Sequence, residues 1–118
     1  MSCKSAARSW PGRQARRSNA PSQYFARRSK QALRPGATAA DVARAENDVF
    51  RKQGLGDYTT SKWTRVRGHG LGLFCDSKPH LLEDVDTPLV PGMTLIVHPN
   101  TYHPEVGYMV LGDAVVVT

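Results

Sequence analysis

The sequence lacks two features that would place it in or across a membrane. It contains no uninterrupted run of 18 apolar residues, so no segment is typical of a membrane-spanning helix. The residues that follow Met1 also lack the apolar stretch that a secretory signal requires. We therefore expect no membrane partner.

Cysteine is scarce as well. Cys3 and Cys75 are the two cysteines of the sequence, and they do not show the spacing of a zinc or redox motif. Their expected state is a pair of free thiols in a reducing compartment. Together with the missing secretory signal, this favours a cytoplasmic location.

Acidic residues are missing from the first 40 positions, and this concentrates the positive charge at one end. Nine of the 16 Lys and Arg residues precede Asp41, which leaves seven basic against ten acidic residues from there onward. That later part has a net charge of −3, although the whole chain carries +6. Residues 1–21 are rich in Arg, Ser, Ala and Pro and have almost nothing to bury, so they are predicted to be a basic disordered leader.

The leader has three interpretations: an organellar transit peptide, a tail that binds nucleic acid, or a non-native leader on a truncated reading frame. We favour the last. The remaining sequence shows no aromatic-rich RNA motif and no recognition helix. A basic-tailed nucleic-acid-binding protein is therefore the least favoured class of function, and only nonspecific binding by the tail is expected.

Two helices are predicted in the first half of the chain. One runs from Gln23 to Leu33, with Ser22 as its cap. The second begins with a capping box at Thr38–Asp41 and stops at Gly54. Asp48 and Lys52 are spaced to form an ion pair on it. Its apolar side chains fall on one face at helical spacing: Ala39, Val42, Ala45, Val49 and Phe50.

Strands dominate the second half. Residues 94–98, 108–111 and 114–117 are β-prone runs, and Gly112-Asp113 between the last two indicates a hairpin turn or a bulge in one long strand. Two helices followed by strands favour an α+β arrangement in which helices pack on one face of a sheet.

The most informative motif is Gly68-His69-Gly70-Leu71-Gly72. Glycine permits positive φ angles and close backbone approach, so the histidine is expected on a loop that presents it in a cleft. Such a histidine serves as a metal ligand, a general base or a donor to an anionic intermediate. A structural turn whose histidine only caps backbone groups is the alternative.

Four sequence blocks in this order resemble the pita-bread family, whose members include aminopeptidase P, prolidase, methionine aminopeptidase and creatinase. The blocks are Arg-Pro-Gly-Ala-Thr-Ala-Ala-Asp-Val (34–42), Gly-His-Gly-Leu-Gly-Leu (68–73), Asp-Thr-Pro-Leu-Val-Pro-Gly-Met (86–93) and the run 113–118. The resemblance extends from about Gln31 to Thr118. It implies that residues 22–118 form the C-terminal part of a pita-bread domain, with two helices packed on a curved, mostly antiparallel sheet.

The resemblance also shows which metal ligands are replaced. In the metallopeptidase branch two aspartates, one histidine and two glutamates hold two divalent metals. His69 matches the histidine, whereas no aspartate lies upstream of Asp41. His98 stands in place of the first glutamate and Gly112 in place of the second. Asp76 occupies the position at which a second, substrate-contacting histidine is usual.

A bridged pair of dications needs several carboxylates to neutralise its charge. We therefore expect no metal cofactor, or at most a single zinc, manganese or cobalt ion at low occupancy. Such an ion would be held by His69 and His98, with Asp113 or Asp76 as a third ligand.

Creatinase is the metal-free branch of the family and cleaves a carbon–nitrogen bond. That branch implies His69, His98 and Asp76 as catalytic acid/base residues. It also implies His103 and Glu105 as substrate-binding residues, although His103 is equally compatible with a solvent-exposed loop.

The sequence therefore predicts a fragment of a creatinase/Xaa-Pro aminopeptidase-like hydrolase with a degenerate, metal-free site. The expected substrate of the full-length parent is a small amide or peptide-like molecule, and the chain alone is expected to be inactive. A non-catalytic pita-bread binding protein is the alternative. Self-association is also expected, because half of a pseudo-symmetric sheet exposes an edge and an apolar face.

Overall fold

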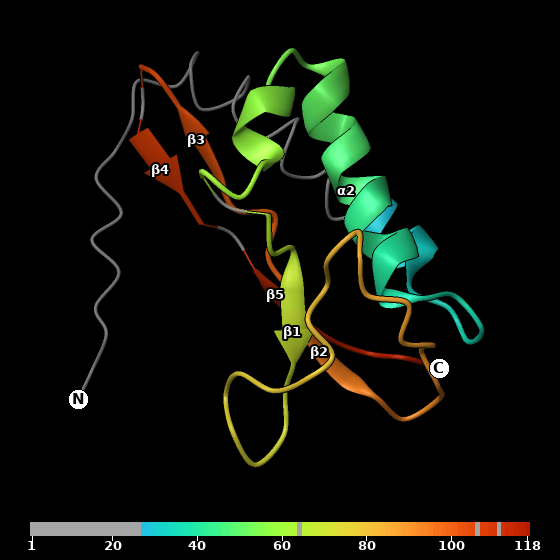
Figure 1. Ribbon diagram of the computed structural model, residues 1–118. Helices are drawn as coiled ribbons and strands as arrows, with labels where there is room; N and C mark the ends of the chain where they lie inside the picture. The colour runs from blue at the N-terminus through green and yellow to red at the C-terminus, as the bar shows by residue number, and fades with distance from the viewer. Residues whose placement is uncertain (1–26, 64, 106, 111) are drawn as a thin grey trace.

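The computed structural model describes residues 27–63, 65–105, 107–110 and 112–118. Residues 27–32 are helical, Leu33 is not, and residues 23–26 of the first predicted helix lie outside the described residues. No helix in these ranges has the length and hydrophobicity to cross a membrane. The elements that follow are α2 (Ala39–Lys52), the 3-10 helix η1 (Gly56–Thr59), β1 (Gly68–Gly70), β2 (Thr94–Val97), β3 (Thr101–His103), β4 (Gly107–Met109) and β5 (Asp113–Val116) (Figure 1).

The local signals that predicted α2 are confirmed at both ends. The Thr38 side chain accepts a hydrogen bond from the Asp41 N–H at 3.2 Å, and Asp41 accepts one from the Thr38 N–H at 2.9 Å. Gly54 adopts a positive φ of 75° just past the last turn. One detail of the prediction is wrong, because Asp48 pairs with Arg51 at 2.9 Å rather than with Lys52.

The buried face of α2 is wider than its apolar stripe. Glu46 and Asn47 are fully or almost fully buried beside the expected apolar side chains. Ala39 and Val42 pack into the main core, whose other members are Leu81, Leu89, Leu95, Val97 and Val117. Val49 and Phe50 form a second cluster against Leu55. The first half of the helix thus packs on the sheet, and its last turns pack on the segment that follows it.

The main sheet has the strand order β1-β2-β5, and both pairings are antiparallel. His69, Ile96 and Ala114 lie opposite one another across the three strands. Because side chains alternate between the faces of a strand, these three share the face opposite the buried Leu95 and Val97. Helices on an antiparallel sheet confirm the predicted α+β class.

The glycine-histidine motif forms a strand, so the expectation of a loop is wrong. The glycines are required by close packing rather than by a free loop. A Cβ on Gly68 would collide with the carbonyl oxygen of Ile96, and a Cβ on Gly70 would collide with the carbonyl oxygen of Lys78. Because these glycines have no side chains, β1 can lie close to β2 on one side and to residues 77–78 on the other.

The second half also contains a short sheet that the sequence did not predict. Among the described strands, β3 and β4 form a two-stranded antiparallel sheet that is separate from the three-stranded one (Figure 1). Gly112-Asp113 is therefore neither a hairpin turn nor a bulge in one strand. It marks the point at which the chain leaves the β3–β4 hairpin and joins β2 as β5.

Candidate functional site

His69 and His98 lie side by side on the face of the sheet that points away from α2. His69 is the central residue of β1, and His98 directly follows the last residue of β2. The His98 N–H donates to the carbonyl oxygen of Arg67 at 3.0 Å, which continues the β1–β2 pairing by one residue. The two imidazole centroids are 5.1 Å apart, with ring planes inclined by 56°. The structure thus brings together the two histidines selected from the sequence.

The environment of His98 favours its neutral form. Burial lowers the pKa of the imidazole, and the positive charges of His69 and Arg67 lower it further, whereas a backbone hydrogen bond and Asp76 act in the opposite direction. Within the described residues, its buried Nδ1 has no hydrogen-bond partner. A neutral His98 therefore retains an unused polar nitrogen beside His69.

His69 has a defined tautomer. Its Nδ1 lies 3.0 Å from the carbonyl oxygen of Gly70. Because a carbonyl oxygen only accepts hydrogen bonds, Nδ1 carries a proton, and in the neutral form of the ring the lone pair is on Nε2. The site histidines can therefore offer lone pairs to substrate N–H groups or to a transferred proton.

Asp76, a predicted catalytic residue, is engaged elsewhere. Its Oδ1 lies 3.0 Å from Nε2 of His80, four residues later, and both side chains are exposed. The sequence analysis did not consider His80, although the spacing of an aspartate and a histidine in one short loop was visible. Asp76 acts on His98 through its charge, as the direction of its effect on the His98 pKa shows.

Gly112, which the family resemblance aligns with a ligand glutamate, lies beside His98. A Cβ built on Gly112 would lie 3.2 Å from the Cβ of His98. Asp113, the next residue, lies opposite Val97 on the other face of the sheet. Its Oδ2 is 4.0 Å from Nζ of Lys30. Strand alternation thus separates Asp113 from the face that carries the two histidines.

The donor set does not fit the two-metal centre that the family resemblance implies. Across the described ranges, no group of three or more His, Cys, Asp or Glu side chains could hold a metal ion. Two neutral imidazoles provide no negative charge to compensate the repulsion between two dications. The two histidines are therefore the side chains on which we base a function for this chain.

The predicted substrate-binding residues lie in or beside the β3–β4 hairpin. His103 is the last residue of β3, opposite Gly107, but its side chain lies outside what the structure describes. Glu105 is exposed in the turn between the two strands. Their roles remain predictions.

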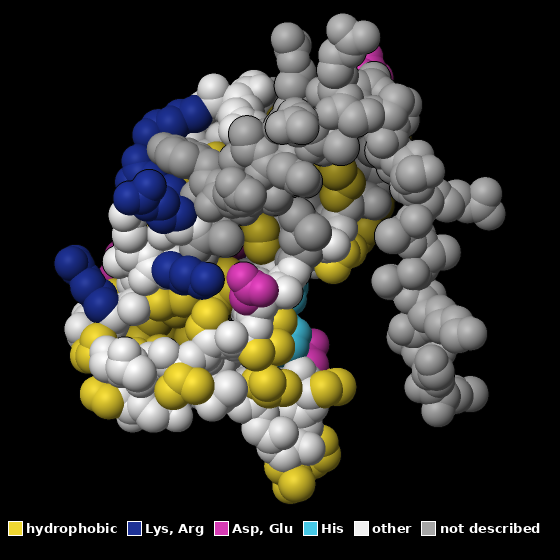
Figure 2. Space-filling view, turned by 180° about the vertical axis from the view of Figure 1, so that it is seen from behind, with side chains coloured by type: hydrophobic (Ala, Val, Ile, Leu, Met, Phe, Trp, Pro, Cys, Tyr) yellow, Lys and Arg dark blue, Asp and Glu magenta, His cyan; other side chains and the backbone are white. Residues whose placement is uncertain are grey.

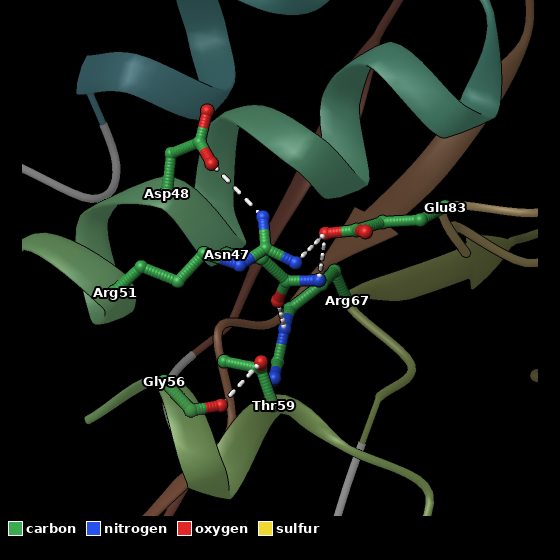
Figure 3. Close-up of polar contacts among 7 residues, drawn as sticks. All are labelled: Asn47, Asp48, Arg51, Gly56, Thr59, Arg67 and Glu83. Carbon is green, nitrogen blue, oxygen red and sulfur yellow. Dashed lines mark hydrogen bonds and ion pairs between the residues drawn. The ribbon is translucent and has the colours of Figure 1, made fainter.

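A buried polar network between Arg67 and α2 was missed by the sequence analysis. Arg67 is fully buried, and its guanidinium lies over the Phe50 ring at 4.8 Å from the centroid. Its Nε donates to Asn47, whose Nδ2 in turn donates to Glu83 at 2.7 Å (Figure 3). Arg51 joins the network through a 2.6 Å ion pair with Glu83. The sequence did contain one signal: Asn47 lies four residues after Ala43 and three before Phe50, which places it on the buried face of the helix.

The fold has clear counterparts among solved peptidases. Dipeptidase PepE from Mycobacterium ulcerans matches with a TM-score of 0.77 at 33% sequence identity, over 92% of this chain and 28% of that chain. Prolidase from Pyrococcus furiosus matches with a TM-score of 0.77 at 27% identity, over 92% of this chain and 31% of that chain. The chain thus has the pita-bread fold of these peptidases.

The sequence comparison identifies the family. Residues 22–118 match the model of metallopeptidase family M24. The "Probable dipeptidase PepE" of Mycobacterium tuberculosis is 35% identical over 96 residues, which are 81% of this chain and 24% of that protein. The chain belongs to this metallopeptidase family, and it spans about a quarter of the length of the curated relatives it matches.

Proposed function

We propose that this chain carries part of the active-site cleft of a peptidase-type hydrolase in which a metal-free histidine pair replaces the two-metal centre. The observation behind the proposal is the 5.1 Å approach of the His69 and His98 ring centroids, with Gly112 directly beside His98. Asp113, the neighbouring acid, lies on the opposite face. His98 and Gly112, which stand in place of the family's two glutamates, therefore lie in the same small region of the sheet.

The proposed substrate of the whole protein is a small amide or peptide-like molecule, in line with the dipeptidase and prolidase names of the relatives. The pair His69 and His98 would accept hydrogen bonds from its N–H groups. His98, whose pKa is lowered by burial, would be the proton acceptor in cleavage of a carbon–nitrogen bond. Asp76 would contribute only its charge.

The chain alone is expected to bind such a substrate without turning it over. The structure records no hydrogen bond between a described carboxylate and either site histidine, so no carboxylate orients His98 as a general base. This expectation also covers the second candidate function, a non-catalytic binding protein that uses the same cleft. The two differ only in the activity of the full-length protein.

NMR titration with the dipeptide Ala-Pro tests the proposal. The ring signals of His69 and His98 should shift on addition of the dipeptide, whereas those of His80, which is paired with Asp76, should not. The shifts should be lost in His69→Ala and His98→Ala and retained in the matched control His80→Ala. Equal shifts at all three rings, or hydrolysis that appears only when manganese or cobalt is added, would contradict a metal-free histidine site.

A further inference from the structure

Arg67 is a charged side chain with no exposed surface, and a charge in such a place must be held by hydrogen bonds. Its Nε donates to Oδ1 of Asn47 on α2. Its Nη1 donates to the carbonyl oxygen of Asn100, 2.5 Å away in the segment that follows β2. The guanidinium therefore connects the helix to the part of the chain that carries His98.

The helix end of this connection is itself fixed. Asn47 donates to Oε1 of Glu83 at 2.7 Å, and the same oxygen receives Arg51 at 2.6 Å. Arg51 is also paired with Asp48 at 2.9 Å, so Figure 3 shows a continuous series of contacts from the surface of α2 to Arg67. A network with each of these groups paired holds a side chain in one place more firmly than a single bond does.

The other end of the connection lies at His98. The backbone pairing of β1 with β2 extends one residue past Val97 and ends at His98, so it does not fix Asn100. The Arg67 carbonyl accepts the His98 N–H at 3.0 Å, and the Arg67 side chain donates to Asn100. The Asn100 N–H in turn donates to the His98 carbonyl at 2.7 Å. One residue thus holds the 98–100 segment at both of its ends.

We infer that Arg67 is a positioning residue that holds His98 against His69, by linking the 98–100 segment to α2 through Asn47. The inference uses the histidine pair of the proposed function as its site, but it concerns geometry alone. It assigns a function to a buried charge that packing does not require, because a well-packed apolar side chain in such a place is often at least as stabilising. Loss of the Arg67 side chain removes the bond to Asn100 and should let the His98 ring move away from His69, while the backbone bond between His98 and residue 67, the helix and the main core stay in place.

The test is the nuclear Overhauser cross-peak between the His69 and His98 rings in the full chain. We expect it in the parent, because the centroids are 5.1 Å apart. It should be lost in Arg67→Met and in Asn47→Ala, although α2 and the β2–β5 pairing keep their own cross-peaks.

Arg65→Met is the matched control. Arg65 lies two residues earlier in the chain, is exposed and pairs with Asp84 at 2.8 Å, so its loss should leave the histidine cross-peak unchanged. A cross-peak that persists in Arg67→Met or Asn47→Ala would overturn the inference, as would equal loss in Arg65→Met. If Arg67→Met does not fold, Asn47→Ala decides. The measurement needs neither metal nor dipeptide, so its failure is distinguishable from failure of the proposed function.

Discussion

The protonation of Glu46 should control how the stability of this domain depends on pH. The side chain is fully buried in α2, where Oε1 accepts a hydrogen bond from the Ser29 hydroxyl at 3.0 Å. Oε2 has no hydrogen-bond partner among the described residues. Burial raises the pKa of the Glu46 carboxyl from 4.5 to about 8, against the smaller opposing effects of Ser29 and Arg67. The folded domain therefore keeps Glu46 protonated at neutral pH.

The sign and size of the effect follow from the difference between the two states. Because the pKa is higher in the folded than in the unfolded chain, the stabilisation is complete below pH 4.5 and is lost progressively up to about pH 8. At 1.36 kcal/mol per unit of pKa, the loss across that window reaches roughly 5 kcal/mol. A domain of this size has a total free energy of unfolding of about 5–15 kcal/mol, so the effect is large.

Glu46→Gln should remove this dependence, because glutamine keeps an oxygen for Ser29 and has no proton to lose. Urea unfolding at several pH values between 5 and 8 would give the free energy of unfolding of both proteins. The difference between the two curves is the relevant quantity, since His98 and other titrating groups contribute equally to each. Asp57→Asn, which removes one exposed carboxyl on η1, is the matched control and should follow the parent. Parallel curves for the parent and Glu46→Gln would refute the reasoning.

Two further predictions concern packing and association. Gly70→Ala should lower the free energy of unfolding by several kcal/mol, because its Cβ would collide with the backbone of Lys78. Gly72→Ala is the control: its Cβ would meet no atom within 4 Å, so the free energy of unfolding should change by less than about 0.5 kcal/mol. Thermal unfolding would compare the two variants, and equal losses of stability would contradict the close approach of the strands at Gly70. The chain should self-associate, because large apolar side chains such as Leu73 (95% exposed) and Phe74 (70% exposed) reach the solvent, and hydrophobic side chains gather over the lower part of the face in Figure 2. Analytical ultracentrifugation should show mass rising with concentration and a weaker rise in the double variant Leu73→Ser/Phe74→Ser; a monomer at every concentration would contradict it.

The parts of the fold that depend on neighbouring residues could be predicted from the sequence. The capping box at Thr38 and the stop at Gly54 fix α2 within a few residues of each end, and both were identified correctly. β1 was mistaken for a loop because its glycines are explained by contacts with Ile96 and Lys78, which are distant in the sequence. β3 was missed for a similar reason, since it is a strand only through its pairing with β4.

The candidate site was predictable only in part. The proximity of His69 and His98 followed from the family resemblance and not from their spacing. The face occupied by Asp113 depended on the register of β5, and a shift of one residue would have reversed it. Arg67 and Glu46 could not be recognised as buried, because arginine and glutamate are almost always exposed unless a partner is provided by the fold.

The metal content of the purified chain is the most direct test of the proposed metal-free histidine pair. The family resemblance implies a two-metal centre at the place of this pair. After dialysis, elemental analysis should find less than one equivalent of cobalt, manganese or zinc per chain, because Gly112 has no carboxylate and Asp113 lies on the other face of the sheet from His69 and His98. A single equivalent lost on either His69→Ala or His98→Ala would indicate a mono-metal site instead. Two equivalents lost together on His69→Ala would contradict the account and establish a metallopeptidase centre.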